Sequence, residues 1–274
     1  MSSSAEITKA EHKRVRALQQ KAGRREQSAF LVEGAKSVHE LLASDWPVVA
    51  VYASHEQAAE FRDATSRRGL RLIEISASLL SSLGNYTNNE SALAIAGQRA
   101  WRAMPLREGQ LTLALDDLRD PGNLGTILRL ADWYGVSQIV ASQTTTELFN
   151  PKVIAASMGS FLRVPFHVVD LPEWLAAARA QAVVCGAVMD GESTHALRGP
   201  LFSAQQPGVL VIGNESKGIS AAIASQLSER VSIPCFGGAE SLNAGVATGI
   251  LLDQWRRDAQ IRSCLLYTSP SPRD

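Results

Sequence analysis

Short apolar runs alternate with longer amphipathic stretches along most of this chain, a pattern typical of α/β proteins. In the first hundred residues, β-branched and other apolar runs predict strands at residues 29–33, 48–53, 70–75 and 91–96. Apolar residues at helical spacing predict helices at residues 9–20, 35–43, 55–66 and 78–83. We therefore expect a compact N-terminal α/β sandwich, over residues 1–98.

The second half of the chain has apolar runs that are continuous rather than alternating, which favours strands of a parallel sheet covered on both faces. The predicted strands are residues 111–116, 138–141, 164–169, 182–188, 208–213 and 230–233. Helices are predicted at residues 124–133, 172–181 and 241–259. This pattern predicts a doubly wound α/β domain over residues 111–262.

Two segments lack any sustained period. Residues 99–110 carry Pro105 and Gly109 among charged residues and are predicted to be a linker. Residues 263–274 show neither helical nor strand spacing, so we expect a disordered tail or a sequence-assembly scar.

Composition narrows the class of protein. With 274 residues the chain is long enough for two cores, and 45% hydrophobic with 20% charged residues is an ordinary globular composition. No apolar run approaches the roughly 18 residues of a membrane span, and the polar start is unlike a signal peptide, so we expect a cytoplasmic protein. Neither the three cysteines nor the five histidines have metal-ligand spacing, so no metal site and no disulfide framework are predicted.

Charge is unevenly distributed although its formal sum is zero. Residues 1–107 hold fifteen basic and eleven acidic side chains, whereas residues 108–274 hold twelve and sixteen. Basic side chains gather at the N-terminal end, where a cationic surface would attract RNA phosphates. A solvated helix face is the alternative. The candidate RNA-binding residues are Lys13, Arg14, Arg16, Lys21, Arg24 and Arg25.

Three loops rich in Gly, Asn and Ser each follow a predicted strand and open a helix. They are residues 120–129 (Asp-Pro-Gly-Asn-Leu-Gly-Thr-Ile-Leu-Arg), residues 213–220 (Gly-Asn-Glu-Ser-Lys-Gly-Ile-Ser) and residues 233–247, which contain Ser-Leu-Asn. Because α/β proteins build ligand sites at the carboxyl ends of strands, the three loops predict one pocket.

Two common nucleotide sites do not match these loops. The second loop has glycines flanking four residues but lacks the Lys-Ser or Lys-Thr pair of a phosphate loop. The first loop lacks the G-x-G-x-x-G pattern of a dinucleotide-binding fold. A Rossmann-like enzyme that uses another nucleotide is therefore disfavoured but left open.

In order and spacing, the three loops resemble the motifs of the SpoU (TrmH) branch of the SPOUT superfamily, which are S-adenosylmethionine-dependent RNA ribose 2′-O-methyltransferases. The resemblance spans residues 111–254 and includes residues 150–165, between the first and second motifs. Residues 30–34, after the basic stretch 21–25, resemble the ribosomal-protein-like substrate-binding domain of many members.

The resemblance implies features that the patterning does not reveal. It implies a deep trefoil knot in the C-terminal domain and a homodimer whose pocket lies near the subunit interface. It implies S-adenosylmethionine as the cofactor, structured RNA as the partner, and no membrane. The favoured substrate is ribosomal RNA; a transfer RNA methyltransferase and a catalytically silent RNA-binding relative are the alternatives.

Matching the motifs residue by residue gives candidate site residues. Arginine stays protonated, so Arg129 is expected to grip a phosphate beside the target hydroxyl, with Asn123 orienting it from the turn. Glu215 would order the site or engage RNA, and the resemblance adds Asn243 to the catalytic set. Expected cofactor contacts come from Gly213, Ile233, Leu242, Asn243 and Ala247.

Each role has a structural alternative. Arg129 could be an ordinary exposed helix arginine, Glu215 a helix-start acid and Ser241 a helix N-cap. The family usually has serine where this chain has Gly245.

Overall fold

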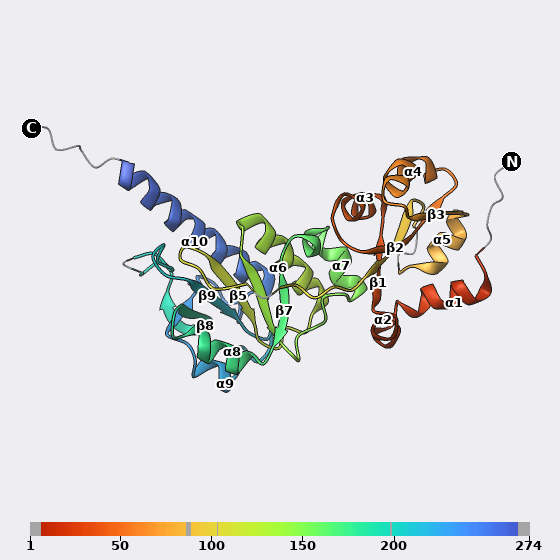
Figure 1. Cartoon of the computed structure of the whole chain (residues 1–274). Helices are drawn as coiled ribbons and strands as arrows, with labels where there is room; N and C mark the ends of the chain where they lie inside the picture. Colours follow the sequence, from red (N-terminus) through yellow and green to blue (C-terminus); the bar gives the residue numbers. More distant parts are fainter. Residues whose placement is uncertain (1–6, 86–88, 103, 198, 268–274) are drawn as a thin grey trace, which may run out of the picture. The chain divides into compact units, whose positions relative to one another are not determined.

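The computed structural model describes residues 7–85, 89–102, 104–197 and 199–267 (Figure 1), with only the backbone for residues 259–267. The chain forms two compact units. Unit 1 is Met1–Ala100 with Glu147–Arg163, and unit 2 is Trp101–Thr146 with Val164–Asp274.

Unit 1 is built on a four-stranded sheet in the order β1-β4-β2-β3. Strand β4 pairs antiparallel with β1 and β2, and β2 pairs parallel with β3. The strands are β1 (Ala29–Glu33), β2 (Val48–Ser54), β3 (Arg71–Ile75) and β4 (Ala92–Gly97). The helices are α1 (Lys9–Ala17), α2 (Lys21–Gln27), α3 (Ala35–Ala43), α4 (Ala58–Arg67), α5 (Ala77–Leu83) and α7 (Pro151–Ser157), with a 3₁₀ turn, η1 (Ser160–Leu162). The predicted α/β sandwich is confirmed.

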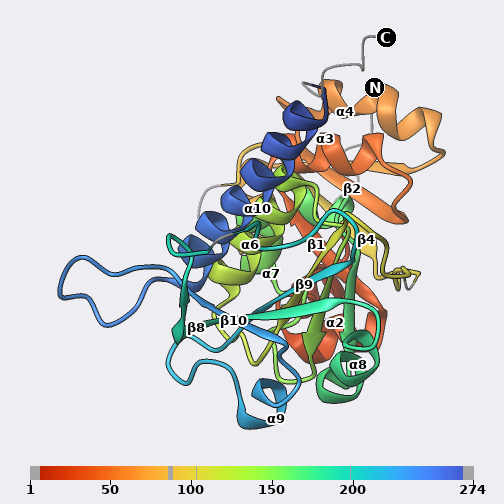
Figure 2. The ribbon, with the colours of Figure 1, turned by 90° about the vertical axis from the view of Figure 1, so that its left-hand side faces the viewer.

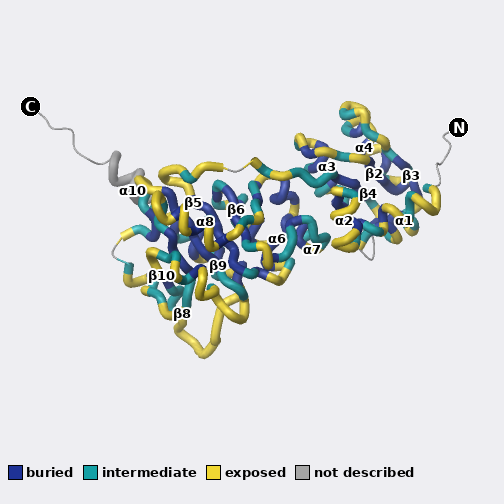
Figure 3. Tube along the Cα trace, turned by 60° about the horizontal axis from the view of Figure 1, so that its bottom comes forward, coloured by how far each residue is buried: buried dark blue, intermediate teal, exposed yellow. Residues whose placement is uncertain are grey.

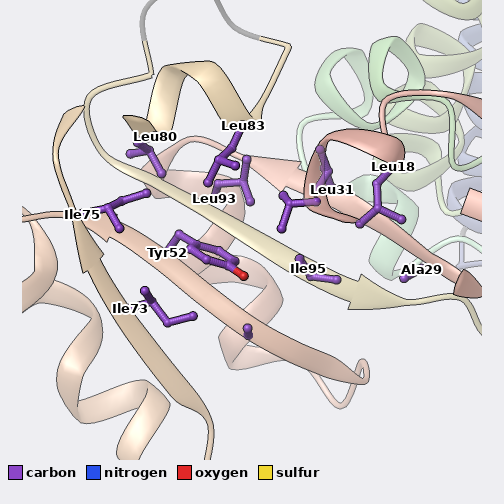
Figure 4. Packing of buried hydrophobic residues seen from close by; sticks show 12 residues of the cluster. Leu18, Ala29, Leu31, Tyr52, Ile73, Ile75, Leu80, Leu83, Leu93 and Ile95 are labelled. Carbon is purple, nitrogen blue, oxygen red and sulfur yellow. The ribbon is translucent and has the colours of Figure 1, made fainter. Parts of the chain in front are cut away.

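One core of unit 1 lies between its sheet and helices α1 and α5 (Figure 4). Tyr52 of β2 is fully buried there, and its hydroxyl donates to Glu11 Oε1 at 2.8 Å. Val15 and Leu18, the two apolar positions of the basic N-terminal segment, are also fully buried. The amphipathic pattern of that segment therefore has a structural role.

The helix predicted at residues 9–20 ends early, at Ala17, and a second helix, α2, begins at Lys21, beyond the predicted range. A Cβ at Gly23 would lie 2.1 Å from the carbonyl oxygen of Ala17, so the two helices approach closely at a glycine.

The segment Glu147–Arg163 packs within unit 1, although the sequence-based boundaries place it in the second domain. Phe149 stacks on Phe30 of β1, with ring centroids 4.5 Å apart, and Phe161 contacts the same ring edge-on at 5.7 Å. Aromatic pairs of this kind stabilise a packing beyond the area they bury. This aromatic cluster explains why residues 147–163 pack within unit 1 rather than within unit 2.

Unit 2 contains a six-stranded sheet in the order β10-β8-β9-β5-β6-β7, and every pairing is parallel. Its strands are β5 (Leu111–Leu115), β6 (Gln138–Ser142), β7 (Phe166–Val169), β8 (Val183–Ser193), β9 (Gly208–Ile212) and β10 (Glu229–Ser232). Its helices are α6 (Pro121–Tyr134), α8 (Leu171–Ala178), α9 (Ala221–Ala224) and α10 (Ala244–Tyr267). The parallel sheet is confirmed, and the trefoil knot stays a prediction.

Both faces of this sheet are covered, as the continuous apolar runs predict. Ala114 and Val211 pack with residues of α8 and α9 in one core, and their neighbours Leu113 and Leu210 are fully buried as well. Burial is deepest along the strands (Figure 3). Helices α6 and α10 lie against each other (Figure 2).

Helix α10 differs from its prediction at both ends. It begins at Ala244 rather than at residue 241, and its backbone continues through Tyr267. The expectation of irregular structure from residue 263 is therefore wrong for residues 263–267. No proline or glycine interrupts them, and extending a formed helix costs little per residue. Residues 268–274 lie outside the described residues.

Candidate active site

A cavity of about 690 Å³ lies at the carboxyl ends of β8, β9 and β10. Its size is within the range of sites for drug-sized ligands and nucleotides. Four of the five residues expected to contact a cofactor line it, namely Gly213, Ile233, Leu242 and Ala247. The second and third motif loops therefore share one cavity.

The loop after β9 is held by its own backbone. Asn214 and Gly218 exchange two backbone hydrogen bonds, of 3.0 and 2.9 Å. A Cβ at Gly213 would lie 2.4 Å from the carbonyl carbon of Gly218 and 2.5 Å from the amide nitrogen of Ile219. Only glycine at position 213 allows the loop to close this tightly.

The third motif loop ends in a helix cap made by Asn243. Its Oδ1 accepts from the backbone N–H of Gly245 at 2.9 Å and of Val246 at 3.3 Å. The alternative that Ser241 caps this helix is therefore wrong, because the helix begins only at Ala244. Asn243 is not among the residues that line the cavity.

A chain of side-chain hydrogen bonds joins all three motifs. Asn123, in the first turn of α6, donates from Nδ2 to Glu215 Oε1 at 2.9 Å. Its Oδ1 accepts from Asn243 Nδ2 at 2.7 Å. Asn123 is 8% exposed, whereas Glu215 and Asn243 are exposed, so the junction lies at the surface of the domain with its central amide buried. Hydrogen bonds thus connect the three loops, but no residue of the first loop is among those that line the cavity, so one pocket shared by all three stays a prediction.

Arg129 lies elsewhere. Helix α6 begins at Pro121 rather than at Leu124, which puts Arg129 in its third turn, about 240° around the helix axis from Asn123. Arg129 is exposed and is not among the residues that line the cavity. The amide of Asn123 contacts Glu215 and Asn243, so the expectation that it orients Arg129 is wrong for a single chain.

Sequence reasoning missed Asp117, which follows β5 with a left-handed φ of 53°. Asn214 Nδ2 donates to its carbonyl oxygen at 2.8 Å, which links the first strand end to the second motif loop. A hydrogen bond from Arg119 lowers the pKa of the Asp117 carboxyl. A non-glycine residue in this backbone region is uncommon and often marks a functional site.

The cavity is also lined by charged residues that the sequence did not predict. Asp190 of β8 and Arg230 of β10 both line it, and Arg230 Nη2 donates to Asp190 Oδ1 at 2.5 Å. This hydrogen bond lowers the pKa of Asp190. The sequence does not single out Asp190 or Arg230, because neither belongs to a recognisable motif.

Five of the six candidate RNA-binding residues in unit 1 are exposed. Arg24 is not, since it is only 3% exposed, so its assignment to RNA binding is wrong. Its guanidinium donates to the carbonyl oxygens of Leu18 and Gln19, both at 2.9 Å, and forms an ion pair with Glu147. Through its two terminal nitrogens, this buried guanidinium holds α1, α2 and the 147–163 segment together.

Within the described parts of the chain, no cluster of three or more His, Cys, Asp or Glu side chains is arranged to hold a metal ion. In the same residues, no helix has the length and apolar character needed to cross a membrane.

The hydrogen-bonded junction gives a first prediction. Replacing Asn123 by Asp would place a second carboxylate against Glu215 and remove the amide donor. We expect Asn123→Asp to lower the free energy of unfolding by about 1–3 kcal/mol and to reduce turnover strongly. Urea denaturation and initial methylation rates measure the two effects. Gln181→Glu makes the same chemical change at an exposed site and should change neither; equal behaviour of the two variants would contradict the role of the junction.

The fold and cavity define a class: an α/β protein with a small-molecule site at the carboxyl edge of a parallel sheet, lined by the second and third motif loops and joined to the first by hydrogen bonds. Residues 110–253 match the model of the SpoU rRNA methylase family, and residues 9–94 match the MRM3-like substrate binding domain. The chain belongs to the SpoU rRNA methylase family.

Characterised relatives resemble nearly the whole chain. It is 28% identical over 236 residues to the 23S rRNA (guanosine(2553)-2′-O)-methyltransferase RlmP of Bacillus subtilis, covering 86% of this chain and 91% of that protein. It is 30% identical over 241 residues to the 23S rRNA (uridine(2479)-2′-O)-methyltransferase of Streptomyces viridochromogenes, covering 83% of each. The crystal structure of an AdoMet-bound rRNA methyltransferase from Sinorhizobium meliloti superposes with a TM-score of 0.82 at 32% identity, covering 92% of this chain and 96% of that one.

Proposed function

We propose that this protein transfers a methyl group from S-adenosylmethionine to a ribose 2′-hydroxyl of ribosomal RNA. The observation that carries the proposal is the hydrogen-bonded chain from Glu215 through Asn123 to Asn243, which ties the three motif loops into one site beside the cavity. The names of the similar proteins support the substrate class and the ribose position.

The cavity suits S-adenosylmethionine in size and in chemistry. Ile233, Leu242 and Ala247 give it apolar walls for an adenine ring and a methionine chain. The carboxylates of Glu215 and Glu240 also line it, and they suit a ligand that carries positive charge on sulfur and nitrogen. Gly213, which also lines the cavity, lets the second motif loop close tightly on Gly218.

When bound, S-adenosylmethionine supplies an electrophilic methyl carbon for an in-line displacement by the ribose oxygen. The chain itself contributes position and charge: the loop junction fixes the cavity wall, and Arg129 holds a phosphate next to the target ribose. Aligning two reactants in this way can supply several kcal/mol of rate acceleration without a covalent intermediate. Asn243 acts by holding Asn123 and capping α10.

The RNA class is tested by offering unmodified ribosomal and transfer RNA transcripts together with tritiated S-adenosylmethionine. After separation by size, we expect label in ribosomal RNA. Label confined to transfer RNA would show that the protein is a transfer RNA methyltransferase, the alternative class. Cofactor binding without label in either RNA would indicate a catalytically silent relative. We also propose a cytoplasmic location.

We further propose a homodimer that packs through α6 and α10. Trp133 of α6 is 84% exposed, and Val246 and Ile250, one turn apart on α10, are also exposed. Arg129 lies one turn before Trp133, so the same contact would bring it to the subunit interface. An apolar surface of this kind is typical of a protein interface.

The dimer predicts that Trp133→Asp yields monomers, because burying an unpaired carboxylate at the interface is costly. Sedimentation velocity measures the assembly state. Val168→Asp places the same charge on another exposed apolar residue of unit 2 and should leave the dimer intact. A monomeric unaltered protein, or a dimeric Trp133→Asp variant, would contradict the proposal.

The exposed cations of α1 predict a salt effect. Replacing Lys13, Arg14 and Arg16 by Ala should weaken RNA binding and reduce the slope of log Kd against log salt by about 2–3, near one per lost phosphate contact. Fluorescence anisotropy at several salt concentrations gives the slope. The double variant Lys36→Ala with Arg67→Ala removes exposed cations elsewhere in unit 1 and should leave it unchanged. An unaltered slope in the triple variant would count against the basic surface.

A further inference from the structure

Phe236 is the most exposed large hydrophobic residue in the described chain, at 88%. It lies on the loop between β10 and α10 and lines the cavity. Figure 2 shows this loop, in lighter blue, projecting away from the sheet. Cβ atoms built at the next two residues, Gly237 and Gly238, would have no neighbouring atom within 4 Å. The loop around Phe236 is therefore surrounded by open space.

A second ring stands beside Phe236. His195 follows β8, and its ring centroid is 6.0 Å from that of Phe236 with an interplanar angle of 36°. The backbone N–H of Thr194 donates to the carbonyl oxygen of Ser232 at 2.9 Å, which ties the turn of His195 to the end of β10. Two loops of unit 2 thus present aromatic rings side by side at the cavity.

Unstacked bases of the RNA substrate are the natural ligands for two exposed rings at this cavity. Proteins commonly recognise structured RNA at single-stranded loops and bulges, where unstacked bases expose their faces. Aromatic side chains commonly receive unstacked bases, and this contact tolerates any base because every base has a π face. Lys217, exposed and lining the same cavity, offers charge for a neighbouring phosphate.

We propose that Phe236, flanked by His195, is a stacking platform for an unstacked base of the RNA substrate at the mouth of the cavity. The inference rests on the proposed function and deepens it by assigning a substrate-positioning surface. The platform acts on RNA binding and placement, and S-adenosylmethionine binds without it.

The test compares Phe236→Ala with Phe236→Trp. Phe236→Ala should raise the KM for ribosomal RNA about tenfold, the loss of one base-stacking contact, with kcat changed far less. Phe236→Trp should behave like the unaltered protein because it keeps an aromatic face. Val168→Ala, which shortens an exposed side chain away from the cavity, is the matched control and should have no effect.

A binding measurement makes the outcome independent of turnover. With S-adenosylhomocysteine present, the anisotropy of a short fluorescein-labelled single-stranded RNA of mixed sequence should report weaker binding to Phe236→Ala and unchanged binding to Phe236→Trp. Calorimetry should give the same Kd for S-adenosylmethionine in all variants, and sedimentation the same assembly state.

The outcomes separate the two proposals. If the unaltered protein labels no RNA but Phe236→Ala still weakens RNA binding, the proposed reaction fails and the platform stands. If the unaltered protein is active and Phe236→Ala matches it in KM and RNA binding, the platform fails alone. A weaker Kd for S-adenosylmethionine in Phe236→Ala would make the ring a cofactor wall, and dissociation of a dimer would make it an interface residue; either result overturns the inference.

Discussion

Replacing Arg129 by Ala is expected to lower kcat by about 10²–10³-fold while the Kd of S-adenosylmethionine stays nearly unchanged. The side chain is exposed on α6 and is not among the residues that line the cavity, so its removal leaves the cofactor walls intact. Its proposed work is to hold a phosphate and offset charge that develops at the ribose oxygen, which matters most in the transition state. Single-turnover methylation and calorimetry measure the two quantities.

Two further variants sharpen this test. Arg129→Lys keeps the charge but not the two-pronged geometry, so it should recover part of the rate. Arg179→Ala removes another arginine of unit 2, one that donates to the carbonyl oxygen of Ser225, and should be fully active. Unchanged turnover in Arg129→Ala would refute its assignment, and an equal loss in Arg179→Ala would show that the effect is not specific.

Gly213→Ala is expected to have the largest effect on cofactor binding. The added Cβ would lie 2.4 Å from the carbonyl carbon of Gly218, and backbone atoms cannot rotate away as a flexible side chain can. Opening the loop to relieve the clash should cost about 1–3 kcal/mol, which raises the Kd of S-adenosylmethionine roughly ten- to hundredfold. Calorimetric titration measures the change.

Gly238→Ala is the control, because it adds the same methyl group on another loop of the same cavity where nothing lies within 4 Å. It should bind the cofactor normally. Circular dichroism should show that Gly213→Ala keeps its secondary structure, since β9 ends at Ile212 and remains paired with β5 and β8. Normal binding by Gly213→Ala would show that this loop is not part of the cofactor site.

Much of this architecture is predictable because buried parallel strands have a strong pattern. The runs that became β5 and β9 are apolar throughout and buried throughout. Since the carboxyl ends of parallel strands lie at one edge, the glycine-rich loops that follow them had to come together. The loops after β9 and β10 share the cavity at this edge, and Asn123 of the first loop is hydrogen-bonded to both.

Features that depend on distant partners were not predictable. Arg24 reads as one more surface cation because its partner, Glu147, is far along the chain. The same separation hides the return of the 147–163 segment, which depends on Phe30 meeting Phe149 and Phe161.

Helix starts were the other source of error. With Pro121 at its first position, α6 includes Asn123, so the six-residue separation places Arg129 about 240° around the helix axis from it. Asn243, rather than Ser241, caps α10 because its side chain reaches the first free backbone N–H groups.

The central claim is that the three joined loops direct the methyl group of S-adenosylmethionine to a ribose oxygen of ribosomal RNA. The most direct measurement is to label unmodified ribosomal RNA with tritiated S-adenosylmethionine, digest it to nucleosides and separate them by chromatography. We expect the label in a 2′-O-methylated nucleoside, and its loss with Arg129→Ala. Label in base-methylated nucleosides, or none from a protein that binds the cofactor, would contradict the account.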